Sequence, residues 1–243
     1  MAESSQQPIE QLFACLSHEL RTPITSLQGA IALLQNHNLN DVSEVGSLLN
    51  LASESTDRLT QIIENILDWY QISQGSKSLF KQPCNITFIL LQLIDSLNSL
   101  TTDKGIQIHL ESPTEITLQA DHYYLTRALS HLLQNAIKFS PSGGQISVTA
   151  ALVEDRTILD VPSLLKIAVQ DQGAGIPESA LEEIFQPFYQ LDTSDTRHHG
   201  GLGLELAICR EIIQQHQGRI WAESTLGQGT TFCVILPILN YST

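Results

Sequence analysis

Two long apolar stripes near the start of the chain restrict most strongly what it can fold into. Apolar residues recur every three or four positions from Ile9 to Leu34 and again from Val45 to Tyr70. This spacing places the apolar side chains on one face of a helix, and a helix of about 30 residues extends about 45 Å. Turn-forming residues at 37–41 separate the two stripes. The sequence therefore predicts an antiparallel α-helical hairpin.

A hairpin of this length carries more apolar surface than its two helices bury against each other. The usual solution is a four-helix bundle, which two copies of the hairpin form by two-fold dimerisation. The alternative is a hairpin whose stripes pack on the C-terminal part of the same chain. Small polar residues at 74–78 mark a domain boundary, so we expect a hairpin domain at 1–75 and a second domain at 76–243.

The first helix carries a polar turn with three chemically active side chains. His18 and Thr22 are four residues apart and share a helix face, with Glu19 beside them. Pro23 has no N–H, so the carbonyl of Glu19 loses its intrahelical partner and we expect the helix to bend or loosen there. The turn offers a nucleophile, a base and a hydroxyl, and the alternative interpretation is a solvated polar patch. A zinc site is disfavoured, because Thr22 stands where a zincin has its second histidine.

Beyond residue 76 the sequence alternates between helical and strand periods. We expect three helices, at 86–100, 121–139 and 204–217. We expect residues 106–110 and 116–118 to form a short strand pair. Further strands are expected at 146–152, 164–169, 219–223 and 230–236. Asp121 is placed to cap the first turn of the second helix. This order predicts an α+β two-layer sandwich, in which a mixed sheet has its helices on one face.

Composition limits the partners of the chain. The formal net charge is −14, which argues against binding to nucleic acid or to an anionic membrane surface. No signal peptide is recognisable and no apolar run approaches the roughly 18 residues of a membrane span, so we expect a cytoplasmic protein without a membrane segment. The cysteines lack metal-type spacing and are interpreted as buried thiols: Cys15, Cys84, Cys209 and Cys233.

Patches of chemically distinctive residues in the second domain together indicate a nucleotide pocket. Asn135 and Lys138 are three residues apart on a predicted helix, where they offer an amide oxygen for a hard cation and an ammonium for phosphate. Asp171 follows a predicted strand and can accept a hydrogen bond from an exocyclic amine. The glycines at 173 and 175 let the backbone approach a flat ring closely.

Two further patches are rich in glycine. The glycines at 200–203 open a predicted helix, whose first N–H groups and dipole favour an anion. Residues 227–229 are most simply a hairpin turn. Neither patch is a P-loop or a dinucleotide-binding fingerprint, and each pattern is weak by itself. The order and spacing of all these patches after the His18 turn carry the interpretation.

Taken together, the motifs resemble those of sensor histidine kinases of the HisKA type. The resemblance covers residues 9–237, and the motifs follow one another in the family's order. The family's H-box is resembled by Phe13–Pro23, its N-box by Asn135–Phe139 and its G1 box by Asp171–Gly175. Its F-box is resembled by Phe185–Phe188, its G2 box by Gly201–Ala207 and its G3 element by Gly227–Gly229. The resemblance implies a dimeric phosphoacceptor hairpin followed by a Bergerat-type ATP-binding domain.

The resemblance also implies an activity and the roles of three residues in the hairpin. His18 is expected to be autophosphorylated from ATP with Mg²⁺ and to pass the phosphoryl group to an aspartate in the receiver domain of a response regulator. Glu19 corresponds to the family's presumed general base. Thr22 corresponds to the residue that orients water when such kinases dephosphorylate their regulator. The implied assembly is a homodimer.

A nucleotide site is implied in the second domain. Asn135 is expected to be the Mg²⁺ ligand and Lys138 to contact phosphate. Phe139 is expected to pack near the adenine ring, and Asp171 is expected to accept a hydrogen bond from the adenine amine. The segment between Gln190 and Gly200 corresponds to the mobile ATP lid, in which Arg197 is the only basic residue. The other positions expected to contact the nucleotide are Gly173, Gly175, Gly201, Gly203 and Leu204.

Three positions depart from the family pattern. His131 stands where an asparagine is frequent, and it either ligates the cation or fills space. Glu205 replaces a frequent glycine, and Gln190 replaces a common arginine. Because each change weakens contacts to the triphosphate, we expect a slow kinase. The alternatives are a phosphatase-dominant or regulatory ATP-binding scaffold, and a non-kinase ATPase akin to the topoisomerase and mismatch-repair enzymes.

Overall fold

The computed structural model describes residues 6–36, 42–73, 79–113, 115–153, 163–191 and 202–238, and within the first helix it describes the side chains of residues 16–35. The chain divides into two compact units. One comprises residues 1–70 with 188–204, and the other comprises residues 71–187 with 205–243.

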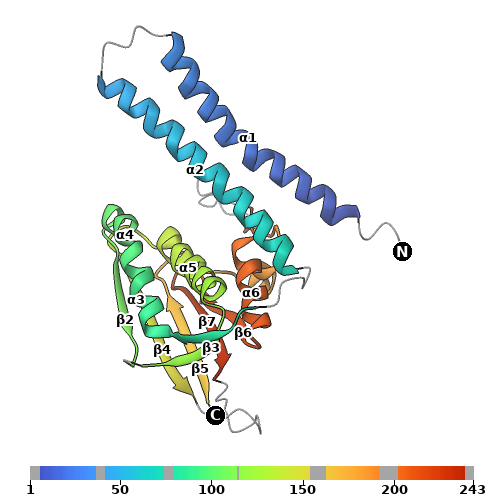
Figure 1. Ribbon diagram of the computed structural model, residues 1–243, viewed down its shortest axis with the longest axis vertical. Coiled ribbons are helices and arrows are strands. Elements are labelled where there is room, and N and C mark those ends of the chain that lie inside the picture. Colours follow the sequence, from blue (N-terminus) through green and yellow to red (C-terminus); the bar gives the residue numbers. More distant parts are fainter. Residues whose placement is uncertain are drawn as a thin grey trace. The chain divides into compact units, whose positions relative to one another are not determined.

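The first unit is built on the predicted helical hairpin. Helix α1 (Gln6–Asn36) has 31 residues and helix α2 (Val42–Ser73) has 32, and the two run side by side (Figure 1). α1 continues through Pro23, which is buried and does not end the helix. The hairpin predicted from the apolar stripes is confirmed. The predicted turn at 37–41 lies outside the described residues.

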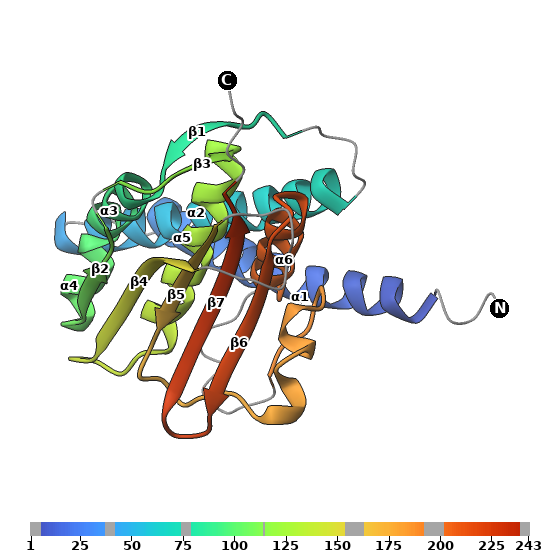
Figure 2. The same ribbon diagram turned by 90° about the horizontal axis from the view of Figure 1, so that it is seen from below.

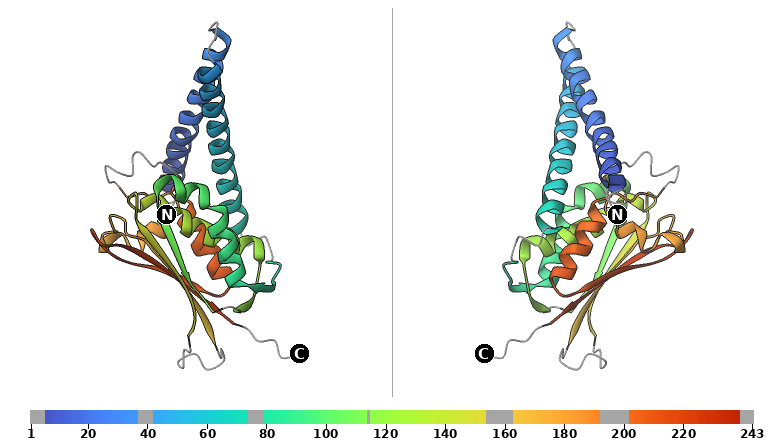
Figure 3. Two further views of the ribbon diagram at one scale, coloured as in Figure 1. Left: turned by 90° about the vertical axis from the view of Figure 1, so that its left-hand side faces the viewer. Right: turned by 90° about the vertical axis from the view of Figure 1, so that its right-hand side faces the viewer.

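The second unit is a five-stranded mixed sheet. Its strand order is β2 (Gln107–Glu111), β4 (Gln145–Val153), β5 (Leu164–Gln170), β7 (Gly229–Pro237) and β6 (Arg219–Thr225). The pair β2–β4 is parallel and the other pairs are antiparallel. Figures 2 and 3 show helices α3 (Ile86–Ser96), α5 (His122–Phe139) and α6 (Glu205–Gln215) on one face of the sheet. The predicted two-layer sandwich is confirmed.

The core lies between this sheet and its helices. Alternate residues of β5 are buried from Leu165 to Val169, as expected for a strand with one covered face, whereas most residues of the central strand β7 are buried, Val234 among them. Helix α5 contributes several leucines with no measurable exposure: Leu125, Leu129, Leu132 and Leu133. As predicted, Asp121 caps α5, because its Oδ1 accepts hydrogen bonds from the N–H groups of Tyr123 and Tyr124. α5 is thus fixed firmly against the sheet.

Two expectations about secondary structure were wrong. The segments 106–110 and 116–118 do not pair with each other: β2 pairs with β4, and β3 (Thr117–Ala120) pairs with β1 (Gln82–Asn85). The helix expected at 86–100 is interrupted at Leu97, and a separate helix, α4 (Asn98–Lys104), follows. α4 ends at Gly105, whose φ of 66° lies in the left-handed region that favours glycine.

The prediction of buried thiols is confirmed for the cysteines whose side chains the structure describes. Cys84, Cys209 and Cys233 are free and buried, as predicted. The structure does not describe the side chain of Cys15. In the ranges given above, none of the helices has both the length and the apolar character that crossing a bilayer requires.

Candidate functional site

The polar turn of α1 presents His18 to solvent beside a nearly buried carboxylate. The His18 side chain is 79% exposed, whereas that of Glu19 is only 12% exposed. Nδ1 of His18 lies 3.7 Å from Oε1 of Glu19. The hydroxyl of Thr22 donates to the carbonyl of His18 at 3.3 Å, which leaves its oxygen lone pairs available. The imidazole therefore has one nitrogen directed at a carboxylate while its ring remains accessible.

Arg58 belongs to this site and was missed in the sequence. Its Nη2 donates to Oε2 of Glu19 at 3.2 Å from the neighbouring helix α2. Glu19 is thus held between an imidazole on one oxygen and a guanidinium on the other. No local pattern indicates this pair, because the two residues are 39 positions apart and only the register of the hairpin brings them together.

The second unit brings Asp171 to a fixed position at the end of β5. Asp171 is 4% exposed, and its Oδ1 accepts from the N–H groups of Gly173 at 2.8 Å and Thr230 at 3.1 Å. Among the described residues no hydrogen bond reaches Oδ2. Burial raises the pKa of the Asp171 carboxyl above its ordinary value, and the two amide bonds oppose this rise. One oxygen therefore orients the group and the other is left for a ligand.

The glycines of the Asp171 segment permit close approaches to protein backbone. A Cβ at Gly173 would lie 2.7 Å from the carbonyl oxygen of Phe139, so this segment packs on the C-terminal end of α5. Gly175 has a φ of 76°, and a Cβ there would overlap the carbonyl oxygen of Thr225. We had expected these glycines to make room for a flat ring. The structure shows that both are already required by the protein's own packing.

Helix α5 carries the other predicted nucleotide contacts of this unit. Asn135 is 6% exposed, although it is polar. Phe139 is 45% exposed, and Nζ of Lys138 lies 5.2 Å from the centre of its ring. The close packing at Gly173 shows that Phe139 and Asp171 lie at the same end of the domain. An amide oxygen suits Mg²⁺ and an ammonium suits phosphate, while an aromatic face and a carboxylate acceptor suit a purine base with an exocyclic amine.

His131 is a buried polar residue on the same helix. It is 5% exposed, and neither ring nitrogen has a hydrogen-bond partner among the described residues. Burial, assisted by the positive charge of Arg127, lowers the pKa of His131 to about 4. The imidazole is therefore neutral at pH 7. No three histidine, cysteine, aspartate or glutamate side chains gather as a metal site in the described ranges.

For the other predicted site residues, contact with a nucleotide stays a prediction. Gly203 and Leu204 immediately precede α6 but fall in the first unit, so their approach to the nucleotide remains a prediction. Gly203 has a φ of 65°, and a Cβ there would lie 2.5 Å from the carbonyl oxygen of Tyr189. Arg197 and Gly201 lie outside the described residues.

Comparison with known proteins identifies both parts of the chain. Residues 9–75 match the His Kinase A (phospho-acceptor) domain. Residues 120–240 match the histidine kinase-, DNA gyrase B-, and HSP90-like ATPase family. The chain belongs to the histidine kinase family. The resemblance inferred from the motifs is thereby confirmed, and the second unit is an ATP-binding domain of that family.

Curated relatives align along nearly the whole of this kinase core. The autoinducer 2 sensor kinase/phosphatase LuxQ of Vibrio vulnificus is 34% identical over 98% of the chain, which covers 27% of that protein. The circadian input-output histidine kinase CikA of Synechococcus elongatus is 33% identical over 98% of the chain, which covers 31% of it. The chain thus spans about a third or less of these two relatives.

Solved structures of histidine kinases share the fold. The kinase ThkA, in complex with the response regulator protein TrrA, matches with a TM-score of 0.70 and 26% identity over 99% of this chain and 65% of that one. ShkA in complex with AMPPNP matches with a TM-score of 0.69 and 28% identity over 96% of this chain and 47% of that one. AdeS of Acinetobacter baumannii, at 21% identity and a TM-score of 0.69, covers 92% of this chain and 98% of its own and supports the fold alone.

Asp171→Asn tests the expectation that Asp171 accepts a hydrogen bond from the adenine amine. The asparagine oxygen can keep the amide bonds from Gly173 and Thr230, so its NH₂ group then faces the adenine amine, a donor against a donor. Loss of a hydrogen bond to a charged group costs about 1.5–3 kcal/mol, so we expect a non-hydrolysable ATP analogue to bind about 10- to 150-fold more weakly by calorimetry. Asp57→Asn, which changes an exposed carboxylate on α2, is the control. Unchanged affinity in the Asp171 variant would contradict the assignment.

Proposed function

We propose that the chain phosphorylates itself on His18 from ATP and then transfers the phosphoryl group to an aspartate of a response-regulator receiver domain. The observation that carries this proposal is the exposed imidazole of His18 beside a carboxylate that Arg58 holds in place. An exposed ring is needed because both the nucleotide and the regulator must reach the same nitrogen. A partly buried, fixed carboxylate is needed because the ring loses a proton during the reaction.

In this proposal the two nitrogens of His18 have different tasks. Nδ1 faces Glu19, so Glu19 favours the tautomer with its proton on Nδ1 and leaves the lone pair on Nε2. Nε2 attacks the γ-phosphorus while the bond to the bridging oxygen of ADP breaks. Glu19 takes the Nδ1 proton that the ring then releases. The phosphoramidate formed is high in energy, which suits onward transfer to a carboxylate.

For the nucleotide we propose a site formed by residues of α5 and of the Asp171 segment, together with the glycine-rich segment before α6. Asn135 would hold the Mg²⁺ ion, which supplies charge neutralisation at the phosphates. Lys138 would contact phosphate, Phe139 would pack near adenine and Asp171 would accept from its amine. The remaining proposed contacts are Gly173, Gly175, Arg197, Gly201, Gly203 and Leu204.

We also propose that the functional unit is a homodimer joined through the hairpin, with the domain boundary at 75/76. Large apolar side chains of α1 and α2 remain at least 40% exposed in the single chain: Ile24, Ile31, Leu33, Leu49, Leu51, Ile63 and Leu67. Burying such a stripe against a second hairpin is the simplest way to remove it from water. The match of residues 9–75 to the phosphoacceptor domain supports the same boundary.

A phosphatase-dominant protein is the second candidate function. Thr22 lies one turn from His18 with its oxygen lone pairs available, and one relative is named a sensor kinase/phosphatase. The departures at His131, Gln190 and Glu205 favour slow autophosphorylation. Rapid dephosphorylation of a receiver domain by the ATP-bound chain, without label on His18, would favour this candidate over the kinase.

His18→Gln tests the proposed phosphoacceptor. Incubation of the chain with γ-labelled ATP should give protein-bound label that is lost in acid and stable in alkali, as expected for a phosphoramidate. The variant should carry no such label while it binds the ATP analogue normally. His109→Gln, an exposed histidine of β2, is the matched control and should label like the parent chain. Label that survives in the His18 variant would refute the assignment.

Arg58→Met tests whether the ion pair with Glu19 positions the base. An exposed ion pair contributes about 0.2–1 kcal/mol, so we expect the autophosphorylation rate at saturating ATP to fall by about 1.4- to 5-fold. The affinity for the ATP analogue should not change, because no proposed nucleotide ligand contacts Arg58. Arg58→Lys should recover most of the rate, and Arg21→Met on α1 is the control. A full rate in Arg58→Met, or an equal loss in nucleotide affinity, would contradict this role.

A further inference from the structure

Helix α5 ends where a proline removes the next backbone donor. The carbonyls in the last turn of a helix have no intrahelical partner, and in α5 the N–H of Ser140 reaches the carbonyl of Ala136 at 3.0 Å. The carbonyl of Ile137 would continue this pattern with the N–H of the next residue, but that residue is Pro141, which has none. Ser140 is accordingly extended, with φ −68° and ψ 144°. The end of α5 therefore needs a donor from elsewhere in the fold.

Lys104 supplies this donor. Its Nζ donates to the carbonyl of Ile137 and to that of Lys138, each at 2.9 Å. A cation at the carboxyl end of a helix also interacts favourably with the helix dipole. Among the described residues no carboxylate forms an ion pair with Lys104. One half-buried ammonium thus satisfies two carbonyls that the helix cannot satisfy by itself.

The backbone around Lys104 is fixed to the same corner of the domain. Lys104 is the last residue of α4, and its own carbonyl accepts from the N–H of Gly143 at 2.9 Å, in the connection between α5 and β4. The N–H of Gln107 then donates to the carbonyl of Gly144 at 3.1 Å, where β2 begins to pair with β4. The long Lys104 side chain is thereby held at its base, so its Nζ has a defined position relative to the end of α5.

The turn that Lys104 holds carries two of the proposed nucleotide contacts. Lys138 and Phe139 are the last two residues of α5, and Nζ of Lys138 lies 5.2 Å from the centre of the Phe139 ring. The carbonyl oxygen of Phe139 lies beside Gly173, where a Cβ would be 2.7 Å from it. Lys104 thus fixes the turn through two carbonyls, and close packing on the Asp171 segment fixes it through a third.

We propose that Lys104 is a positioning residue for the nucleotide, because it keeps the last turn of α5 helical and so holds Lys138 and Phe139 in the geometry that binds phosphate and adenine. The inference rests on the proposed roles of those two residues. Nζ of Lys104 is directed at backbone carbonyls, so it acts through the turn and not as a phosphate ligand. Without it the turn opens, and the apparent affinity for nucleotide falls to the fraction of molecules in which the turn is closed.

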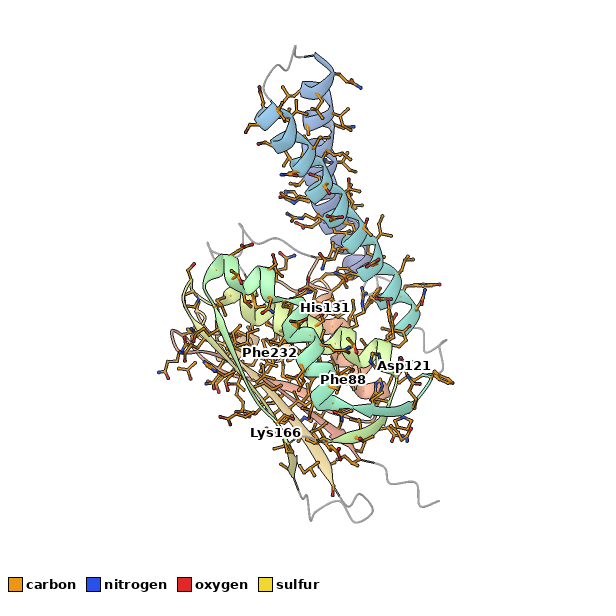
Figure 4. The ribbon with its side chains drawn as sticks, turned by 60° about the vertical axis from the view of Figure 1, so that its left-hand side comes forward. Phe88, Asp121, His131, Lys166 and Phe232 are labelled. Carbon is orange, nitrogen blue, oxygen red and sulfur yellow. The ribbon has the colours of Figure 1, made fainter. Side chains whose placement is uncertain are left out.

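The direct test is the binding of a non-hydrolysable ATP analogue with Mg²⁺ to the full chain, measured by calorimetry. We expect Lys104→Met to weaken binding about tenfold, as for a turn that is closed in about a tenth of the molecules. Lys104→Arg should recover most of the affinity, because a guanidinium can also donate to two carbonyls. Lys166→Met, on the face of the sheet away from the helices (Figure 4), is the matched control and should bind like the parent chain. Unchanged affinity in Lys104→Met would overturn the inference.

Backbone chemical shifts without nucleotide separate an open turn from a destabilised domain. In Lys104→Met the ¹³Cα shifts of Lys138 and Phe139 should move away from helical values, whereas that of Leu129, near the middle of α5, should stay helical. Helical values at Lys138 and Phe139 in the variant would overturn the inference. Loss of the helical value at Leu129 as well would mean that Lys104 stabilises the whole domain, and would also overturn it.

A double-mutant cycle with Lys138→Met tests whether Lys104 acts through the turn. Because residues in contact are not additive, the loss of affinity caused by Lys104→Met should be smaller by about threefold or more when Lys138 is already replaced. Equal losses in the two backgrounds would overturn this inference alone. A parent chain that does not bind the analogue, or a Lys138→Met variant that binds it like the parent, would overturn the proposed nucleotide contacts and this inference with them.

Discussion

Glu19 lies between a nucleophile on its own helix and a cation on the next, and the proposed chemistry depends on this arrangement. One carboxylate oxygen faces Nδ1 of His18 and the other accepts from Arg58. The imidazole is 79% exposed and the carboxylate only 12% exposed. A freely rotating carboxylate in water would be a weak and poorly placed base. The register of the hairpin therefore fixes the position of the proposed base, in addition to forming the proposed dimer surface.

Helix α5 contributes both to the core and to the proposed nucleotide site. Its leucines are completely buried against the sheet, while Asn135 and His131 place polar groups at a similar depth. Polar groups at that depth are costly unless a ligand satisfies them. Asp171 shows how the same domain limits such a cost, since backbone amides bind one of its oxygens. Rigid packing and a few unsatisfied polar atoms together make a preorganised site.

Sequence reasoning predicted the parts of this structure that local patterns determine. The hairpin helices and α5 follow from apolar spacing and from the Asp121 cap. Strand pairing was partly wrong, because β2 finds its parallel partner β4 only after a long crossover. The helix break at Leu97 had no signal, since a buried leucine continues the apolar stripe. Arg58 was missed for a similar reason, as only the tertiary register brings it to Glu19.

The family motifs pointed to Asn135 and Asp171 as candidate site residues. They did not show that Gly173 and Gly175 are needed for backbone packing.

The most direct test of the central claim is which nitrogen of which histidine receives the phosphoryl group. The chain labelled with ¹⁵N-histidine can be phosphorylated with ATP and studied by ¹⁵N and ³¹P nuclear magnetic resonance at alkaline pH. Because Glu19 faces Nδ1 of His18, the account predicts phosphorus bonded to Nε2 of that residue. Phosphorus on Nδ1 of His18, or on another histidine, would contradict it.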